Sequence, residues 1–232
     1  MTASELRVPS PLRLLRLLIG VDLDGTIEDS RNDMVAAVQR VRAELQLGAR
    51  ADELVRPHVN GGMDALYRAC FDDYRPHSHD SERLSVIRDA YETDYLAHVA
   101  VDTQLYPGMR AALEGLARLG TLACVTNKPE RISRRLLDEL GVGELFATVV
   151  GGDSCAQAKP HPIMLQTAAL RTGFDPSRGK AFMIGDTNAD MQLARAYGAQ
   201  AVWCAWGYVA AISETPDARA SEPAELVRIV SS

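Results

Sequence analysis

The chain of 232 residues carries 25 basic and 31 acidic side chains, and hydrophobic residues make up 47% of it. This composition is typical of a soluble globular protein with one large domain, or with a core domain that carries an insertion. The formal net charge of −6, without a dense basic cluster in the sequence, argues against a nucleic-acid-binding protein.

Residues 1–11 are predicted to form a loose leader that the core does not need. Residues 11–18 are apolar enough to suggest a signal peptide or a membrane anchor. Arg13 and Arg16 interrupt this stretch and no small-residue cleavage site follows, so we expect neither, and no membrane partner. Four cysteines lie far apart in the sequence, which favours buried thiols in a reducing cytoplasm: Cys70, Cys124, Cys155 and Cys204.

The first predicted strand, residues 17–21, is a continuous apolar run, as expected of a strand buried on both faces. Side chains two apart on a strand point the same way, so Asp22 and Asp24 are expected together at its C-terminal edge. Two carboxylates forced together repel each other unless a cation lies between them. The pair therefore indicates a metal site, an acid/base pair, or both. An ordinary turn is the alternative, because Asp, Gly and Thr are common turn formers.

Between residues 29 and 106 the sequence shows no convincing buried strand, and the apolar spacing is helical. The pattern predicts one helix from about Met34 to Leu47, a second after Gly62, and a third from about Asp80 to Val101. A block of helices is therefore expected directly after the first strand.

After Pro107 the predicted strands and helices alternate, which implies a parallel sheet with helices on both faces. Strands are predicted at 122–126, 147–150, 181–186 and 201–204, and helices near 109–119, 131–140, 163–171, 189–197 and 223–230. The fold class expected is a doubly wound α/β core with an inserted helical unit.

Thr126, Asn127 and Lys128 follow one of these strands. A hydroxyl and free backbone N–H groups at a strand-to-helix junction can donate hydrogen bonds to a phosphate, beside the positive end of the next helix. Taken alone, Thr-Asn before a helix is more simply an N-cap.

Lys159 precedes Pro160, and Pro162 follows two residues later, so the lysine is expected on a stiffened loop ahead of a helix. A fixed ammonium there can neutralise a nucleophilic carboxylate and a phosphoryl group together. A solvated surface lysine is the alternative.

Asp186 and Asp190 follow another apolar strand and would lie one helical turn apart on one face. Carboxylate oxygens are the ligands that Mg²⁺ takes, usually with waters and substrate phosphate. Asp190 has a second reading as an acidic residue favoured by the helix dipole.

These four clusters, in this order near strand ends, resemble the motifs of the haloacid-dehalogenase-like superfamily of aspartate-nucleophile phosphatases. The resemblance runs from about Leu17 to Val230. It implies a doubly wound core formed by residues 1–29 and 106–232, and a helical cap formed by residues 30–105. Ligand sites in such open sheets lie outside the C-terminal strand ends.

The resemblance also implies a role for each cluster. Asp22 would be the nucleophile that forms an aspartyl-phosphate, and Asp24 would protonate the leaving oxygen and later activate water. Mg²⁺ would be held by Asp22, the backbone carbonyl of Asp24, and Asp186, with Asp190 in support. The implied phosphate-binding residues are Thr126, Asn127 and Lys159.

The activity implied is Mg²⁺-dependent hydrolysis of a small phosphorylated metabolite in the cytoplasm. Residues 151–162 and Trp206-Gly207-Tyr208 are similar to phosphoglycolate-phosphatase-like members, so 2-phosphoglycolate is the best candidate substrate. Related members act on sugar phosphates, nucleotides, pyrophosphate or N-acetylmuramic acid 6-phosphate. Glu28 stands where these relatives usually have an apolar residue, and we expect it to alter the site entrance.

Two alternatives stay open: a β-phosphoglucomutase-like enzyme, which would share every catalytic residue, and a non-catalytic binding module on the same fold. The module would be expected to lack one of the key residues, and none is missing. Asp24 argues against a 2-haloacid dehalogenase, which has no aspartate there. The sequence leaves the oligomeric state open.

The inserted helices are expected to choose the substrate, because the core clusters recognise only phosphate. Gly61 and Gly62 let the backbone approach a ligand closely. The residues expected to determine specificity are Arg56, Asn60, Gly61, Gly62 and Arg68, with the arginines available for a second anionic group such as a carboxylate. The alternative is a plain interhelical turn with both arginines solvated.

Overall fold

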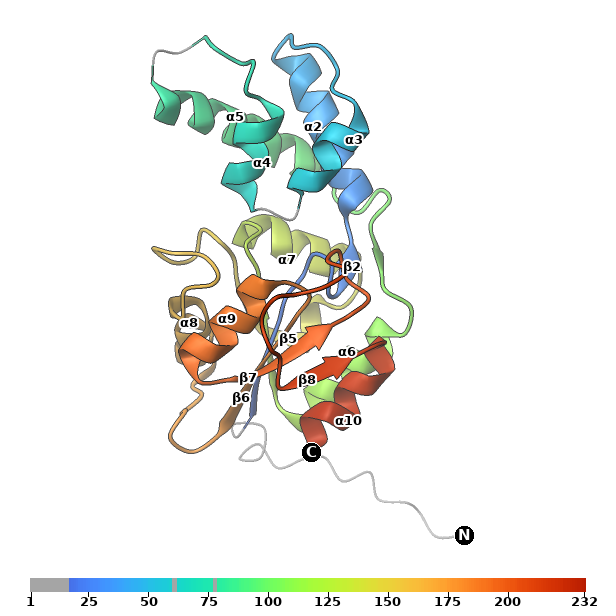
Figure 1. Ribbon diagram of the computed structural model, residues 1–232, viewed down its shortest axis with the longest axis vertical. Helices are drawn as coiled ribbons and strands as arrows, with labels where there is room; N and C mark the ends of the chain where they lie inside the picture. Colours follow the sequence, from blue (N-terminus) through green and yellow to red (C-terminus); the bar gives the residue numbers. More distant parts are fainter. Residues whose placement is uncertain (1–16, 60–61, 77–78) are drawn as a thin grey trace.

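A six-stranded sheet with all neighbouring strands parallel forms the core of the computed structural model, which describes residues 17–59, 62–76 and 79–232 (Figure 1). The strand order is β5-β4-β1-β6-β7-β8. These strands are β1 (Leu17–Val21), β4 (Thr121–Val125), β5 (Phe146–Val150), β6 (Lys180–Gly185), β7 (Gln200–Cys204) and β8 (Ala218–Ala220). The predicted doubly wound α/β class is confirmed, and β8 is an edge strand that the sequence pattern missed.

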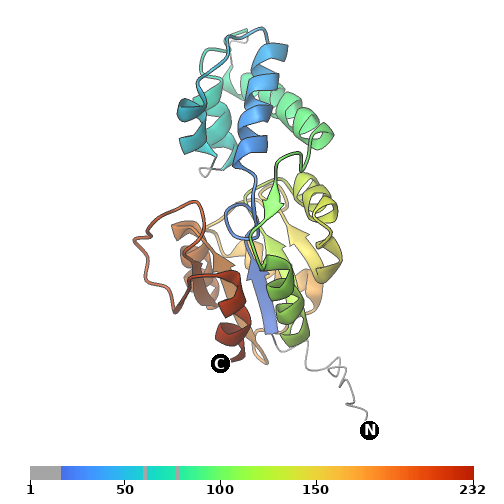
Figure 2. The same cartoon turned by 90° about the vertical axis from the view of Figure 1, so that its right-hand side faces the viewer.

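Helices cover both faces of this sheet (Figure 2). Consecutive side chains of β1 point to opposite faces, so Ile19 packs in one apolar cluster and Leu18 in the other. The first cluster includes side chains of α6 (Met109–Leu119), α7 (Glu130–Glu139) and α10 (Leu226–Ser231), and the second those of α8 (Ile163–Thr172) and α9 (Asn188–Tyr197). Burial on both faces explains why the strand sequences are continuous apolar runs.

The register brings the predicted clusters to one edge of the sheet. Val21, the last residue of β1, lies opposite Cys124 of β4 and Ile184 of β6. The residues that follow these three neighbouring strands therefore emerge at the same C-terminal edge. This edge is where open α/β sheets bind their ligands.

The inserted segment forms a second group of helices, which Figures 1 and 2 show above the C-terminal edge of the sheet. It consists of α2 (Arg31–Glu44), α3 (Asp52–Val55), the 3₁₀ helix η1 (Arg56–His58), α4 (Met63–Cys70) and α5 (Asp80–Ala97). These helices have their own apolar cluster, which Ile132 of α7 joins. The division into core 1–29 and 106–232 and cap 30–105 stays a prediction, with which the separate clusters agree.

Two short antiparallel strands, β2 (Glu28–Asp29) and β3 (Gln104–Leu105), lie where the chain enters and leaves the inserted helices. The sequence predicts no strand between residues 29 and 106, because a strand of two residues is too short to show a periodic pattern. Two further 3₁₀ helices, η2 (Gly143–Leu145) and η3 (Pro223–Glu225), complete the described elements. No helix of the described residues combines the length and apolar character needed to cross a bilayer.

Asp33, near the start of α2, ties the two connections together. Its buried carboxylate accepts hydrogen bonds from the backbone N–H groups of Asp102 and Thr103, at 3.0 to 3.1 Å. The hydroxyl of Thr103 donates a further bond of 2.6 Å to Asp33 Oδ2. One carboxylate thus satisfies three donors of the chain that returns to the core.

We predict that Asp33→Ala lowers the free energy of unfolding by about 2–3 kcal/mol, because it leaves these donors without a partner. Urea denaturation with a single set of baselines measures this change. Thr103→Val removes only the hydroxyl bond and should cost roughly 1 kcal/mol. An equal loss of unfolding free energy in the two variants would show that the backbone hydrogen bonds to Asp33 contribute nothing, and would contradict this account.

Candidate active site

The carboxyl end of β1 carries the two aspartates on which the site is built. Asp22 is buried, its backbone N–H donates to the carbonyl of Ile184 at 2.9 Å, and its Oδ1 accepts from the N–H of Leu23 at 2.8 Å. Gly25 then turns the chain with a φ of +79°, and a Cβ there would lie 2.6 Å from Asp186 Oδ2. Only glycine fits between this turn and the aspartate of the neighbouring strand.

Lys159 joins two of the carboxylates. Its Nζ lies 2.6 Å from Asp22 Oδ1 and 2.8 Å from Asp190 Oδ1, and its side chain is 3% exposed. The lysine is therefore no solvated surface residue. Its backbone N–H donates to Asn127 Oδ1 at 2.9 Å, which fixes the lysine loop against the loop after β4.

Asp22, Asp186 and Asp190 offer carboxylate oxygens that all lie within 4.8 Å of one another, and all three residues are buried. Burial, and then the charge of Asp190, raise the pKa of Asp22 well above its ordinary value, and the same two causes raise the pKa of Asp186 to about 7. The one ammonium of Lys159 does not balance three carboxylates. This donor set fits Mg²⁺, a hard divalent cation that prefers oxygen ligands.

Asp186 and Asp190 are held differently. Asp186 Oδ2 accepts from the backbone N–H of Tyr208 at 2.8 Å, and its Oδ1 lies 3.3 Å from the hydroxyl of Thr26. Asp190 Oδ2 closes a capping box with Thr187, accepting its N–H at 3.0 Å and its hydroxyl at 2.6 Å. Since Asp190 Oδ1 binds Lys159, this residue serves the helix terminus and the lysine together.

Asp24 has its own cation. Lys128 Nζ lies 2.6 Å from Asp24 Oδ1, and the hydroxyl of Ser30 donates to the same oxygen at 2.5 Å. Burial opposes ionisation of Asp24, but the charge of Lys128 and hydrogen bonds from Lys128 and Ser30 hold the pKa of Asp24 below its ordinary value. The two aspartates of the strand end thus sit in opposite electrostatic environments.

Glu28 lies beneath this pair and not at the entrance that the sequence analysis expected for it. Its side chain is fully buried in β2, and burial together with the charge of Asp24 raises the pKa of Glu28 well above its ordinary value. A neutral carboxyl is the form that such a site favours.

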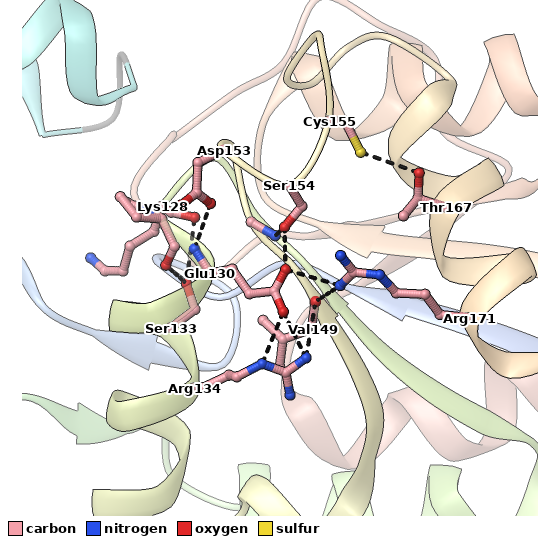
Figure 3. Close-up of polar contacts among 12 residues, drawn as sticks. Lys128, Glu130, Ser133, Arg134, Val149, Asp153, Ser154, Cys155, Thr167 and Arg171 are labelled. Atoms are coloured by element: carbon pink, nitrogen blue, oxygen red, sulfur yellow. Dashed lines mark hydrogen bonds and ion pairs between the residues drawn. The ribbon is translucent and has the colours of Figure 1, made fainter.

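The loop after β4 carries the predicted phosphate-binding residues. Thr126 is buried, and its hydroxyl accepts the backbone N–H of Lys128 at 3.2 Å. The next residues are anchored by the network of Figure 3, in which Glu130 accepts from Arg134 and Arg171, both at 2.8 to 3.0 Å, and from Ser154. This network holds the start of α7 against the loop after β5.

A cavity of about 110 Å³ joins these groups below the inserted helices. Its lining includes Asp22, Asp24, Thr126, Asn127, Lys128 and Lys159 from the core, and Met34, Val59, Gly62 and Met63 from the inserted segment. A second cavity of about 570 Å³ shares Gly62, Met63, Asn127 and Lys159 with it and is further lined by Arg88 and Glu92 of α5 and by Asp153. A phosphate in the first cavity would thus direct the rest of a substrate toward the second.

Of the predicted specificity residues that the structure describes, one lines the two cavities and two do not. Gly62 lines both cavities, whereas Asn60 and Gly61 lie outside the described residues. Neither Arg56 nor Arg68 is among the described lining residues: Arg56 donates to Asn32 Oδ1 at 2.9 Å, and Arg68 pairs with Asp80. A role for these arginines in specificity stays a prediction.

Several residues that shape the site were given no role by the sequence analysis. Lys128 and Ser30 bind Asp24, and Tyr208 binds Asp186. Lys128 had a signal in the sequence, because it directly follows Thr126-Asn127 at a strand end. Contacts over such long sequence separations are not visible in a periodic pattern.

Comparison with known proteins identifies the family. Residues 19–204 match the family described as haloacid dehalogenase-like hydrolase. A phosphoglycolate phosphatase of Aquifex aeolicus is 33% identical over 210 residues, covering 90% of this chain and 94% of that protein. A phosphoglycolate phosphatase of Pseudomonas syringae pv. tomato is 36% identical over 193 residues, covering 82% and 70%.

A solved structure agrees with this assignment. A Haemophilus somnus protein described as a predicted phosphoglycolate phosphatase superposes with a TM-score of 0.77 at 25% identity, covering 93% of this chain and 98% of its own. The family match spans the strand ends that carry the buried aspartates. The chain therefore belongs to the haloacid dehalogenase-like hydrolase family.

Proposed function

We propose that the chain is a Mg²⁺-dependent phosphomonoesterase that works through an aspartyl-phosphate on Asp22, with 2-phosphoglycolate as its best candidate substrate. One observation carries this proposal: the buried carboxylate of Asp22 shares a cavity of about 110 Å³ with the hydroxyl of Thr126 and the ammonium of Lys159. A carboxylate nucleophile beside a donor and a fixed cation suits attack on a phosphoryl group.

The two aspartates divide the chemistry. A carboxylate oxygen of Asp22 attacks phosphorus, while Asp24 supplies the proton that the leaving oxygen takes up. Asp24 then accepts a proton from the water that hydrolyses the aspartyl-phosphate. Lys159 offsets charge on Asp22 and on the phosphoryl oxygens, and Thr126 and Asn127 orient the phosphate.

Asp22 and Asp186 would hold Mg²⁺ with the backbone carbonyl of Asp24, and Asp190 would support the site through Lys159. When bound, the ion supplies positive charge to the phosphoryl oxygens and screens the carboxylates from one another. The excess of buried carboxylates over cations is the feature of this chain that supports the proposal.

The substrate assignment rests on the relatives named phosphoglycolate phosphatase at 33% and 36% identity. A small substrate is also compatible with the first cavity, while the second leaves room for a larger leaving group, as in a sugar phosphate. A β-phosphoglucomutase-like activity is the second candidate, since the same acid/base pair would serve it.

Asp22→Asn should reduce Mg²⁺-dependent phosphate release from p-nitrophenyl phosphate by several orders of magnitude, because the amide keeps the shape but is no nucleophile. The rate of phosphate release measures this, with circular dichroism as the check on folding. A folded variant that keeps more than about a hundredth of the activity would point to water as the direct nucleophile.

The metal site predicts an unusual dependence of stability on pH. An unfolded Asp186 releases its proton near 3.8, whereas the folded protein keeps it up to about 7. Between these values the native state binds more protons than the unfolded state, so this residue lowers stability as pH rises from about 4 to 7. Bound Mg²⁺ should oppose this loss above pH 7.

Thermal unfolding at pH 5 and pH 8, with and without Mg²⁺, tests this expectation. Mg²⁺ at 100 times its dissociation constant should stabilise the protein by about 2.7 kcal/mol at pH 8 and by less at pH 5. Asp186→Asn should lose most of this increment, while Asp89→Asn, on the exposed side of α5, should keep it. An Mg²⁺ effect that is the same in both variants would place the ion elsewhere.

A panel of phosphate esters tests the substrate. We expect kcat/KM for 2-phosphoglycolate to exceed the values for glucose 6-phosphate, N-acetylmuramic acid 6-phosphate, a nucleotide and pyrophosphate by at least about tenfold, which corresponds to roughly 1.4 kcal/mol. A sugar phosphate that surpasses 2-phosphoglycolate would assign the second cavity to a larger leaving group and overturn the substrate assignment.

A further inference from the structure

Lys128 contacts the core and the inserted helices at once. Its Nζ lies 2.6 Å from Asp24 Oδ1 and 4.8 Å from the ring centroid of Tyr95, which belongs to α5. The side chain of Lys128 is 3% exposed, and Tyr95 is also buried. The ammonium is therefore enclosed between the aspartate and the face of an aromatic ring.

The rest of Lys128 is fixed by the loop that binds phosphate. Its backbone N–H donates to the hydroxyl of Thr126 at 3.2 Å, and its carbonyl accepts from the N–H of Gly152 at 3.0 Å. Figure 3 shows the side chain extending away from the network around Glu130, so that network holds the backbone and leaves the ammonium to Asp24. The position of Asp24 Oδ1 is thus tied to the position of the phosphate loop.

A buried ion pair is a poor source of stability, because desolvation of the two charges offsets their attraction. A well-packed apolar residue in place of Lys128 would fill this space without that cost. We therefore look for the role of this buried ion pair in the reaction and not in stability.

We propose that Lys128 is a positioning residue for Asp24, the acid/base carboxylate of the proposed function on which this inference rests, and that Tyr95 completes the binding site of its ammonium. Ser30 and Lys128 both bind Oδ1, so the carboxyl plane of Asp24 cannot turn freely. A general acid must be held within hydrogen-bond reach of the atom that it protonates.

The pair also favours the carboxylate form of Asp24, which is the form that remains after its proton is transferred. As an oxygen of Asp22 bonds to phosphorus, the bond from phosphorus to the leaving oxygen breaks, and that oxygen takes the proton of Asp24. Asp24 is then a carboxylate beside the ammonium of Lys128. In the second half, water bonds to phosphorus and gives a proton to Asp24, the bond to Asp22 breaks, and inorganic phosphate leaves.

The contact with Tyr95 links this pair to the inserted helices. The ring faces a cation that has almost no access to water, where a cation–π contact is strongest. Tyr95 stacks on Tyr91 with a centroid distance of 5.8 Å, and Tyr91 meets Tyr67 edge-on at 5.4 Å. This aromatic stack holds the ring of Tyr95 over the ammonium of Lys128.

Leaving-group release in the first turnover, measured by rapid quench, tests the role of Lys128. Lys128→Met keeps an unbranched side chain that is one atom shorter and removes its charge. With 2-phosphoglycolate, whose alkoxide needs a proton, release should slow by about 100-fold or more. With p-nitrophenyl phosphate, whose phenolate leaves without a proton, it should slow by less than about tenfold. Lys128→Arg should recover part of the first loss.

The two substrates separate a positioning role from a structural one. Equal slowing with both substrates, no slowing, or a rise in KM at unchanged kcat would overturn the proposal. A wild-type protein without Mg²⁺-dependent phosphate release would instead contradict the proposed function itself. The Mg²⁺-induced stabilisation of Lys128→Met serves as the check that the site remains folded.

A second set of variants tests Tyr95. Tyr95→Leu removes the ring face and should slow release from 2-phosphoglycolate more than release from p-nitrophenyl phosphate, while Tyr95→Phe keeps the ring and should restore the wild-type ratio of the two rates. Tyr91→Leu is the matched control, because this ring lies in the same stack, whereas the ring face that the Lys128 ammonium contacts belongs to Tyr95. The same change of ratio in Tyr91→Leu would overturn the assignment to Tyr95.

Discussion

The site depends on burying carboxylates at the end of a parallel sheet and pairing Asp22, Asp24 and Asp190 with two fixed lysines. Asp22 shares Lys159 with Asp190, and Asp24 is bound by Lys128. Removing one partner of a buried pair leaves an uncompensated charge, which is costly. The segments after β1, β4, β5 and β6 are therefore held together by charge as well as by the sheet.

The same arrangement separates the functions of two aspartates that are two residues apart. Burial and the neighbouring Asp190 raise the pKa of Asp22, whereas Lys128 and Ser30 keep the pKa of Asp24 low despite burial. Without a further cation these directions oppose the proposed roles, because a nucleophile must be ionised and a general acid protonated, so Asp22 needs a cation beside it to lower its pKa. In the proposed function Asp22 is the nucleophile, and Asp24 exchanges protons with the leaving oxygen and with water.

Much of the fold could be predicted because buried parallel strands are continuous apolar runs. The strands that carry Asp22, Thr126 and Asp186 all follow this rule, and their predicted bounds differ from the observed ones by a residue or two. The strands β2, β3 and β8 have at most three residues each, too few for periodicity to appear. Only the motif residues of the site could be predicted. The ion pair of Lys128 with Asp24 joins residues 104 positions apart, which no local pattern reveals. Arg56 and Arg68 bind Asn32 and Asp80, which the sequence pattern did not indicate.

The central claim is that the phosphoryl group passes through Asp22. Asp24→Asn should slow hydrolysis of the intermediate while p-nitrophenyl phosphate can still form it, because phenolate leaves without an acid. Acid quench of this variant during turnover, followed by mass spectrometry of its peptides, is the most direct measurement. The account predicts the mass of one phosphoryl group on the peptide that contains Asp22. A phosphoryl group on another residue, or none while p-nitrophenol is released, would contradict it.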